Sequence, residues 1–437
     1  MSYLMLFIYL ALLILIINRS KFFKSKSLSG FWVSLIFISK FIAGIILWAM
    51  YSYMFSERAS GDIFKYFDDG NIIFYALREN PLDYLRMVTG IGADAPHLMQ
   101  YYDTCWYWIK EFNYGLINDN RIVIRFNAFV RLFSLGNIHI HTLFMSFASF
   151  TGLWGIYKVF ESKTKTFTFF KVVAIFFLPS VFFWTSGLLK EGLLSLGFGL
   201  LFYHIDRFLN NKATLKSALV IAACIFLLLL SKFYVLVAAI PGFLFLLLHK
   251  YLNIKSIGIK LLLTHGIFII LAWFSDPLVG INFPNIIANK QHDFINQTNS
   301  MNEVGSAINI GKLDSTFTTL IINTPKALFN SLLRPTIYEA KNAPMLMAAA
   351  ENSLIAILVV LSIVFFRKKH LDEPLFWFSI SFCTILFCLI GLTTPVLGAL
   401  VRYKAPALPF LGMIFIYLID NDKINLILKR LRSKMLN

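Results

Sequence analysis

The chain opens with Met1-Ser-Tyr-Leu-Met-Leu-Phe-Ile-Tyr-Leu-Ala-Leu-Leu-Ile-Leu-Ile-Ile-Asn18 and continues directly into Arg19-Ser-Lys-Phe-Phe-Lys-Ser-Lys26. The apolar run 3–18 is close to the length at which a helix crosses a bilayer, and no signal-peptide cleavage site follows it. A short basic segment directly after such a run is typical of a loop that stays on the cytoplasmic side. This stretch therefore predicts a retained transmembrane helix followed by a cytoplasmic loop.

The composition of the whole chain agrees with this interpretation. Of the 437 residues, 58% are hydrophobic and only 14% are charged, whereas soluble domains carry roughly 25% charged residues. The formal net charge of +17 could indicate a nucleic-acid partner. Its cationic residues, however, lie in short loops between apolar runs, as in membrane proteins. We therefore expect an integral membrane protein that binds membrane lipid and no nucleic acid.

The apolar runs predict an all-α, polytopic membrane protein with about 11 transmembrane helices, forming one integral membrane domain over residues 1–437. Two pairs of neighbouring runs are separated by so few residues that we expect tight hairpins, 169–187 with 191–205 and 218–231 with 234–248. The eleven runs are 3–18, 31–55, 138–160, 169–187, 191–205, 218–231, 234–248, 257–274, 352–366, 374–393 and 404–420.

The basic connections predict the orientation. If the N-terminus is external and the chain crosses eleven times, every basic connection falls on the same side, which should be the cytoplasm. The C-terminus is then cytoplasmic, and the bias toward Lys, Asn, Ile and Phe favours a bacterial inner (plasma) membrane. The six connections are Arg19–Lys26, Lys163–Lys165, Arg207–Lys216, His249–Lys260, Arg367–His370 and Lys423–Lys434.

Two long segments, about 56–137 and 275–351, fall on the external side under this topology. Loops of that length without secondary structure are uncommon, so both should be structured. Each contains an amphipathic pattern that predicts a helix in the membrane interface, Arg121–Phe133 in the first loop and Ser315–Leu333 in the second.

Two further stretches of these loops have a predicted role. The segment Trp106-Tyr-Trp108 is typical of an aromatic anchor at the membrane surface. The polar stretch Asn289–Asn302 predicts a loop without regular structure.

Acidic residues gather in Gly61-Asp-Ile-Phe-Lys-Tyr-Phe-Asp-Asp-Gly70, just after the second apolar run. In a helix, Asp62, Lys65, Tyr66 and Asp69 would share one side. Carboxylates at a membrane–water boundary suit the general base of an enzyme that acts on a lipid-linked substrate. The alternative is a solvated turn with a local Asp62–Lys65 pair. The candidate catalytic residues are Asp62, Asp68 and Asp69.

Basic groups map to the same side, where they could bind a phosphate. The simpler alternatives are lysines that snorkel at helix ends and a structural clamp between Arg334 and a glutamate, Glu339 or Glu351. The candidates are Lys190 and Glu191 at the first hairpin tip, Lys232 at the second, Arg334 in the second long loop, and Arg402 and Lys404 at the last external tip.

Acidic and basic groups at one interface suit a substrate with a hydroxyl to activate and a phosphate leaving group. No Gly-rich phosphate loop occurs, and no cytoplasmic domain is expected that could hold a nucleotide sugar, so the donor should be lipid-linked. The four cysteines lack metal-ligand spacing. We expect no metal site and no certain cofactor, and the sequence leaves open a divalent metal that bridges the phosphate.

Three stretches resemble the GT-C class of membrane glycosyltransferases, which use polyprenyl-phosphate sugars. They are Gly61-Asp62-x-x-x-Tyr66-x-x-x-Gly70, the hairpin Pro179–Glu191, and Arg402-Tyr-Lys-Ala-Pro-Ala-Leu-Pro409. The resemblance implies an inverting transfer of sugar to a glycan, lipid or protein acceptor in cell-envelope glycan synthesis. It also implies that Asp62 is the base and that Lys190, Lys232 or Arg402 neutralises the departing phosphate.

The chain departs from that pattern in two ways. An extra helix precedes the acidic loop, and no second acidic residue directly follows Asp62, which keeps Asp68 and Asp69 as rival bases. The O-antigen and exopolysaccharide polymerases resemble the chain about as well, and for them Arg334 and Arg402 would matter more. A lipid-linked oligosaccharide flippase or other transporter, and a non-catalytic membrane scaffold, are the remaining hypotheses.

Overall fold

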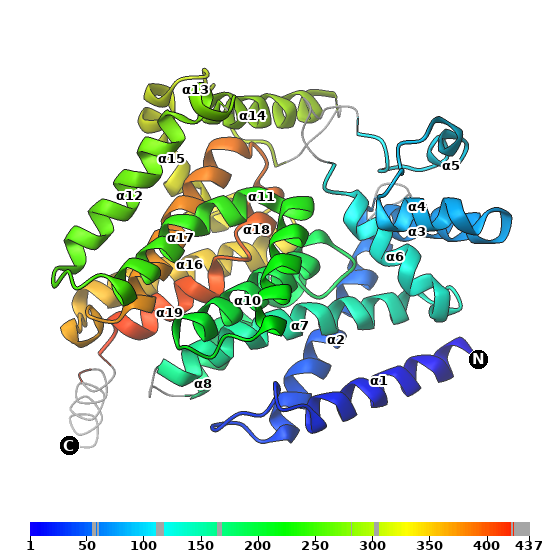
Figure 1. The fold of residues 1–437 in the computed structure, drawn as a ribbon, viewed down its shortest axis with the longest axis horizontal. Helices are drawn as coiled ribbons and strands as arrows, with labels where there is room; N and C mark the ends of the chain where they lie inside the picture. Colours follow the sequence, from blue (N-terminus) through cyan, green and yellow to red (C-terminus); the bar gives the residue numbers. More distant parts are fainter. Residues whose placement is uncertain are drawn as a thin grey trace. The chain divides into compact units, whose positions relative to one another are not determined.

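The structure is a computed structural model that describes residues 1–54, 58, 61–110, 118–163, 168–280, 282–300, 306–420 and 423. Over these residues every regular element is a helix, and only two isolated β-bridges occur (Figure 1). The predicted all-α class is therefore confirmed for the described part of the chain.

Six helices of the described residues are long and apolar enough to cross a membrane, and a seventh span results if the bent pair α18 and α19 counts as one. These helices agree with a polytopic membrane protein, while the count of eleven is not confirmed. The six are α1 (Ser2–Arg19), α2 (Gly30–Met54), α7 (Ile138–Lys163), α11 (Leu215–Tyr251), α16 (Ala343–Val364) and α17 (Pro374–Thr393).

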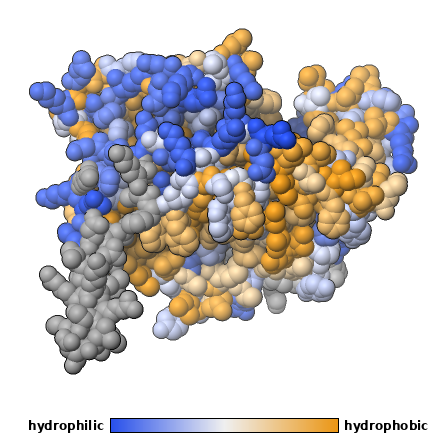
Figure 2. Space-filling model, turned by 90° about the horizontal axis from the view of Figure 1, so that it is seen from below, coloured by the Kyte–Doolittle hydropathy of each residue, from blue (hydrophilic) through white to orange (hydrophobic). Residues whose placement is uncertain are grey.

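The helices expose large apolar side chains that a soluble fold would bury. Phe7 on α1, Leu262 on α12 (Ile257–Trp273) and Ile363 on α16 are each at least 65% exposed. Figure 2 shows hydrophobic residues gathered in broad areas of one face. Such surface is expected of helices that face lipid.

The chain forms two compact units. The first consists of Met1–Thr168 and Ser180–Leu236, and the second of Phe169–Pro179 and Val237–Asn437. The chain passes between them in the broken stretch 168–180 and again within α11.

The first unit is built on α7 and α10 (Lys190–Leu209), which pack closely along their length. A Cβ atom on Gly199 would lie only 2.0 Å from the carbonyl oxygen of Gly152, so the two backbones touch and only glycine fits there. Helices α1 and α2 pack against α7 as well. This arrangement gives α10 a fixed position, and its first residues are Lys190 and Glu191.

A helical cap of the first unit follows α2. It contains α3 (Asp62–Glu79), α4 (Pro81–Thr89), α5 (Met99–Tyr102), α6 (Arg121–Ser134) and a short 3₁₀ turn, Pro96–Leu98. Helix α3 packs against both α4 and α6, and buried apolar side chains join them in one core. The predicted amphipathic helix at Arg121–Phe133 is confirmed as α6.

The prediction of a surface anchor at Trp106-Tyr-Trp108 is wrong for Trp108. That side chain is fully buried, stacks on Tyr102 with ring centroids 4.7 Å apart, and lies under the guanidinium groups of Arg121 and Arg125. An indole enclosed by another ring and two cations is a core residue of the cap, stabilised by apolar burial and cation–π contacts. Trp106, in contrast, is 55% exposed.

The two predicted hairpins take the form of interrupted helices. The first contains α8 (Thr168–Val172), a π-helical turn (Val173–Phe177), a break at Leu178 and α9 (Pro179–Trp184) before α10. The second is one helical run, α11, interrupted at Lys232, whose φ of −141° and ψ of 80° are not helical. The interruption at Lys232 lies at the predicted tip of the second hairpin, whereas the break at Leu178 lies within the predicted first arm of the first hairpin, whose predicted tip coincides with the start of α10.

The second unit packs α15 (Phe317–Leu333) on α17 and packs α19 (Leu408–Leu418) on α17 and on the π-helical turn of the first hairpin. Its other described elements include the part of α11 from Val237 onward, α12, α13 (Ser275–Val279), α14 (Phe283–Ser300), the 3₁₀ turns Ile337–Glu339 and Lys368–His370, α16 and α18 (Leu397–Tyr403). The predicted helix within Ser315–Leu333 is confirmed as α15.

The loop predicted for Asn289–Asn302 is wrong as far as Ser300, because α14 covers those residues. Its buried Gln291 explains why. The Gln291 amide donates to the carbonyl oxygens of Gly311 and Leu392 at 2.9 and 2.7 Å, and its oxygen accepts from Leu313 N–H at 2.9 Å. Tertiary hydrogen bonds of this kind stabilise a helix whose polar composition alone disfavours one. Residues 301 and 302 lie outside the described residues.

Candidate functional site

The acidic stretch Gly61–Gly70 forms the first turns of α3, so the predicted helical face exists. That face receives the segment around Tyr107, which lies far along the chain. The Tyr107 hydroxyl donates to Asp62 Oδ1 at 2.8 Å, and the Lys65 ammonium lies 4.6 Å from the Tyr107 ring centre. Asp62 is therefore part of a tertiary contact with Tyr107. The alternative of a solvated turn with a local Asp62–Lys65 pair is not needed to explain the acidic stretch.

Asp69 has a different role on the same face. Its carboxylate is fully buried and accepts the backbone N–H groups of Trp106 and Tyr107, both at 2.8 Å. Burial raises the pKa of Asp69 to about 6, although the two N–H groups oppose the shift. This geometry is that of a structural clamp that holds the Trp106–Tyr107 backbone on α3.

Asp68 points elsewhere and forms a bidentate pair with Arg58, at 2.9 and 2.7 Å. Its partner is 54% exposed, so the pair is a surface salt bridge. Of the three candidate bases, Asp62 thus combines partial burial with a phenol hydroxyl as hydrogen-bond partner. That combination suits a general base better than a backbone clamp or a surface pair.

A polar segment at 118–121 connects α3 with the start of α10. The Tyr66 hydroxyl donates to Asn120 Oδ1 at 3.0 Å, one helical turn from Asp62. The Asn118 amide donates to the carbonyl oxygens of Tyr107 and Trp108 at 3.1 and 2.9 Å. These three bonds fix the two neighbours of Asp119, Asn118 and Asn120.

Asp119 lies between two lysines. Its Oδ1 is 2.8 Å from Lys190 Nζ and 3.6 Å from Lys110 Nζ. The three side chains keep between 12% and 21% of their surface exposed. Two cations around one carboxylate leave a net positive charge in a partly solvated place, which can bind an anion such as a phosphate. The sequence prediction named Lys190 but missed Lys110.

Glu191 and Lys232 form a second pair beside this one, with Glu191 Oε1 3.0 Å from Lys232 Nζ. Their side chains are 0% and 3% exposed, respectively. Glu191 lies in the first turn of α10, where a negative charge is favoured, and Lys232 lies at the interruption of α11. The pair therefore joins the start of one helix to the break in another.

Lys40 supports the loop that precedes Lys190, and the sequence analysis missed it. It lies within the apolar helix α2, is fully buried, and donates to Thr185 Oγ1 at 2.7 Å and Ser186 Oγ at 3.0 Å. Ser146 on α7 donates to the Ser186 carbonyl oxygen at 2.7 Å. A lysine inside an apolar run is the signal that could have identified it, because intramembrane charges are rare without a role.

The other predicted residues lie in the second unit. Arg334 donates to Glu339 Oε1 through Nε at 2.7 Å and through Nη2, so of the two glutamates considered for a clamp, Glu339 is its partner. These bonds, together with those from Thr336, lower the pKa of Glu339 to about 2. Arg402 is half-buried on α18.

Lys404 was expected at the last external tip, and the structure shows that its side chain is fully buried. It donates to Asn352 Oδ1, and the Asn352 amide donates to the Pro335 carbonyl oxygen at 2.9 Å. Lys404 thus stabilises the backbone next to Arg334. Burial follows from the bend between α18 and α19, which turns this residue inward.

Within the described residues of both units, no group of three or more His, Cys, Asp or Glu side chains could hold a metal ion. One Ser–His–Asn sequence of hydrogen bonds exists, Ser134–His141–Asn127, but all three side chains are fully buried. No substrate can reach them there, so they form a structural network.

The comparisons with known proteins give no assignment. No protein-family model, no curated protein and no solved structure matches this chain.

Proposed function

We propose that the protein is a membrane glycosyltransferase that moves a sugar from a polyprenyl-phosphate-linked donor to a glycan, lipid or protein acceptor. The observation that carries the proposal is the polar network of the first unit. In it Tyr107 donates to the half-buried carboxylate of Asp62, and its carbonyl oxygen accepts from Asn118, the residue before Asp119 and its lysine pair. A base and a cationic phosphate site are the two parts that such a transfer needs.

Asp62 is the proposed general base. In an inverting transfer, the acceptor hydroxyl attacks the anomeric carbon, Asp62 takes the hydroxyl proton, and the bond to the lipid phosphate breaks with its electron pair. The Tyr107 hydroxyl orients the carboxylate at 2.8 Å. Asp69 is excluded from this role in the proposal because its two oxygens already accept backbone N–H groups.

Lys190 is the proposed phosphate ligand, with Lys110 beside it. Asp119 holds both ammonium groups but neutralises only one charge. The departing phosphate would replace part of that contact and gain charge-assisted hydrogen bonds. Lys232 and Glu191 are positioning residues in this scheme, because their buried pair fixes the start of α10.

The proposal places the reaction at the external face of a bacterial inner membrane, with an external N-terminus and a cytoplasmic C-terminus. The charge distribution along the sequence supports this orientation. The segment that holds Asp62, Tyr107 and Asp119 follows an even number of apolar helices, α1 and α2. If both helices cross the membrane, as we propose, these residues lie on the same side as the N-terminus.

Glycan production in cells that lack the protein tests the proposal. The deletion is complemented at matched protein level with Asp62→Asn, Lys190→Met, Asp68→Asn as the matched acidic control, and Arg402→Ala. Loss of the glycan with Asp62→Asn and Lys190→Met, but not with Asp68→Asn, is expected. Full production with Asp62→Asn would refute the base assignment.

Two other outcomes separate the competing hypotheses. Loss only with Arg402→Ala would favour an O-antigen or exopolysaccharide polymerase, whose chemistry depends on arginines in the external loops. An unchanged glycan in the deletion itself would favour a flippase, another transporter or a scaffold. A purified protein that releases polyprenyl phosphate only when an acceptor is present would distinguish transfer from transport.

A further inference from the structure

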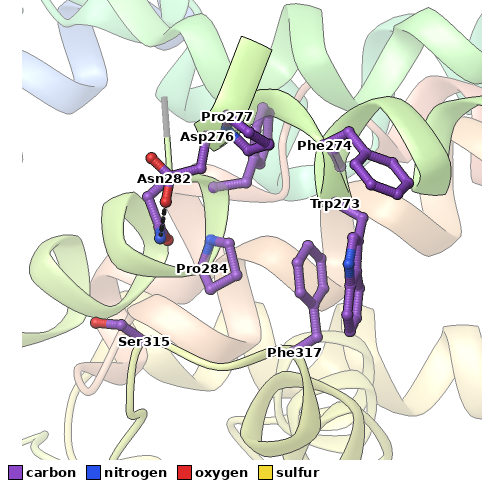
Figure 3. Close-up of a pocket in the computed structure, with 10 residues that line it drawn as sticks. Trp273, Phe274, Asp276, Pro277, Asn282, Pro284, Ser315 and Phe317 are labelled. Atoms are coloured by element: carbon purple, nitrogen blue, oxygen red, sulfur yellow. Dashed lines mark hydrogen bonds between the residues drawn. The ribbon is translucent and has the colours of Figure 1, made fainter. Parts of the chain in front are cut away.

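A cavity of about 260 Å³ lies in the second unit, where α12 ends and α13, α14 and α15 begin. Its lining comes from separate segments of the chain, and Figure 3 shows the side chains around it. The lining includes Trp273, Asp276, Asn282, Pro284, Ser315 and Phe317.

One side of the cavity is an aromatic platform. The rings of Trp273 and Phe317 stack with centroids 4.6 Å apart and planes 19° apart. In Figure 3 the Phe317 ring lies between Trp273 and Pro284. Because Trp273 supports one face of Phe317, the other face is held as a rigid apolar surface toward the cavity.

The other side is polar. The Asn282 amide donates to Asp276 Oδ2 at 3.0 Å, which fixes the orientation of the carboxylate, and Figure 3 draws this bond. Ser315 donates to Asn285 Oδ1 at 3.0 Å, which fixes its hydroxyl at the rim. A carboxylate oxygen accepts more than one hydrogen bond, so Asp276 can still accept from a ligand hydroxyl.

We propose that this cavity binds one pyranose ring of the acceptor glycan. A pyranose has an apolar C–H face and a rim of hydroxyls, which match the Phe317 platform and the Asp276–Asn282 edge. The cavity is smaller than the roughly 300–1,000 Å³ of most ligand sites, so a single ring is the size that fits. Its role as an acceptor site rests on the proposed function, whereas sugar binding itself does not.

Two other ligand classes fit the cavity less well. A free phosphate or another anion is disfavoured by the Asp276 carboxylate. A quaternary ammonium group binds where several ring faces surround one point, but Trp273 and Phe317 lie parallel and present one face. A simple membrane anchor would explain the tryptophan at the end of α12 but not the three polar side chains opposite.

Binding to the purified full-length protein in nanodiscs tests the inference. Saturation-transfer NMR with glucose, galactose, N-acetylglucosamine and rhamnose detects the ring protons that contact the protein. At least one of these sugars should bind to the wild type. Binding should weaken by roughly tenfold in Phe317→Ala, since loss of an aromatic contact of about 1.4 kcal/mol corresponds to that factor.

The matched control is Phe329→Ala, which removes a 55% exposed ring from the same helix outside the cavity and should leave binding unchanged. Asp276→Asn should also weaken sugar binding. If Phe317→Ala does not fold, this second variant tests whether the cavity is the sugar site. The inference is overturned if no sugar binds, if both variants bind as the wild type does, or if phosphocholine binds in place of the sugars.

The Asp62→Asn protein separates this inference from the proposed function. It should bind the sugar as the wild type does, because Asp62 lies in the other unit. If the wild type binds a sugar but proves to have no transferase activity, the acceptor role and the proposed function are contradicted. The inference that the cavity binds a sugar then still holds. Transfer without any binding at the cavity would overturn this inference alone.

Discussion

The buried pair Glu191–Lys232 gives the most quantitative prediction. Each single change, Glu191→Gln or Lys232→Met, leaves one charge without its partner at a place where the two side chains are 0% and 3% exposed. Removing one member of a buried pair typically costs about 3–5 kcal/mol, because the remaining charge is desolvated and uncompensated. We expect each single variant to lose that amount of stability.

The double variant Glu191→Gln/Lys232→Met should lose much less than the sum of the two. No buried charge is then left alone, so the double variant should lose no more than either single variant, and the coupling energy of the cycle should be about 3 kcal/mol or more. The matched control is Asp68→Asn, which breaks a pair whose arginine is 54% exposed. That change should cost less than about 1 kcal/mol.

Thermal unfolding in one detergent measures these effects, with a thiol-reactive dye as reporter. The dye suits this protein because Cys224 and Cys383 are buried free thiols that become accessible on unfolding. A loss of this size should lower the Tm of the single variants by roughly 5–15 °C. If both single variants unfold within about 2 °C of the wild type, or if their effects simply add, the pair does not hold α10 to α11.

Three further predictions concern other parts of the two units. Burial raises the pKa of Asp69 to about 6, so as the pH falls the folded protein protonates this carboxylate before the unfolded chain does. The stability of the wild type relative to Asp69→Asn should therefore rise as the pH falls from about 7 to about 4. A stability difference between the two proteins that does not change with pH in thermal unfolding would contradict this. Lys40→Met should reduce glycan production more than Lys40→Arg at equal protein level, because only the arginine can still donate to Thr185 and Ser186. Equal glycan production by the two variants would rule out a positioning role for Lys40. Glu339→Gln should lower thermal stability at pH 7 but not near pH 2. The pKa of Glu339 is lowered to about 2, so the stabilisation by its carboxylate is fully present above the ordinary pKa near 4.5 and is lost as the pH falls through 2. A loss of stability in Glu339→Gln that persists at pH 2 would contradict the Arg334 pair as its cause.

The sequence was informative wherever a local pattern decides the structure. The spacing of Asp62, Lys65, Tyr66 and Asp69 predicts one helical face, and α3 provides it. The amphipathic pattern at Arg121–Phe133 likewise predicts α6. These patterns depend on helix geometry alone, which the sequence contains in full.

Partners distant in the chain could not be predicted in the same way. Nothing near Asp69 shows that its oxygens accept N–H groups from residues 106 and 107, which sequence reasoning placed at the membrane surface. The helix α14 depends on bonds from Gln291 to residues 311, 313 and 392. Tertiary packing overrides local composition in both places.

The candidate site shows the same division. The acidic and basic residues were identified by type, but only the structure pairs Lys190 with Asp119 and adds Lys110. It also separates Asp62, which accepts a phenol hydroxyl, from Asp69, which holds the backbone. Choosing among three carboxylates required their hydrogen-bond partners, which one sequence does not contain.

Mass spectrometry of lipid extracts tests the central claim most directly. Cells that lack the protein, and cells that carry Asp62→Asn at wild-type protein level, should both accumulate the polyprenyl-phosphate-linked sugar, because the donor is made but not consumed. Cells with the wild type or Asp68→Asn should not accumulate it. Equal amounts of the lipid-linked sugar in all four strains would contradict the claim that this protein transfers a sugar from such a donor with Asp62 as its base.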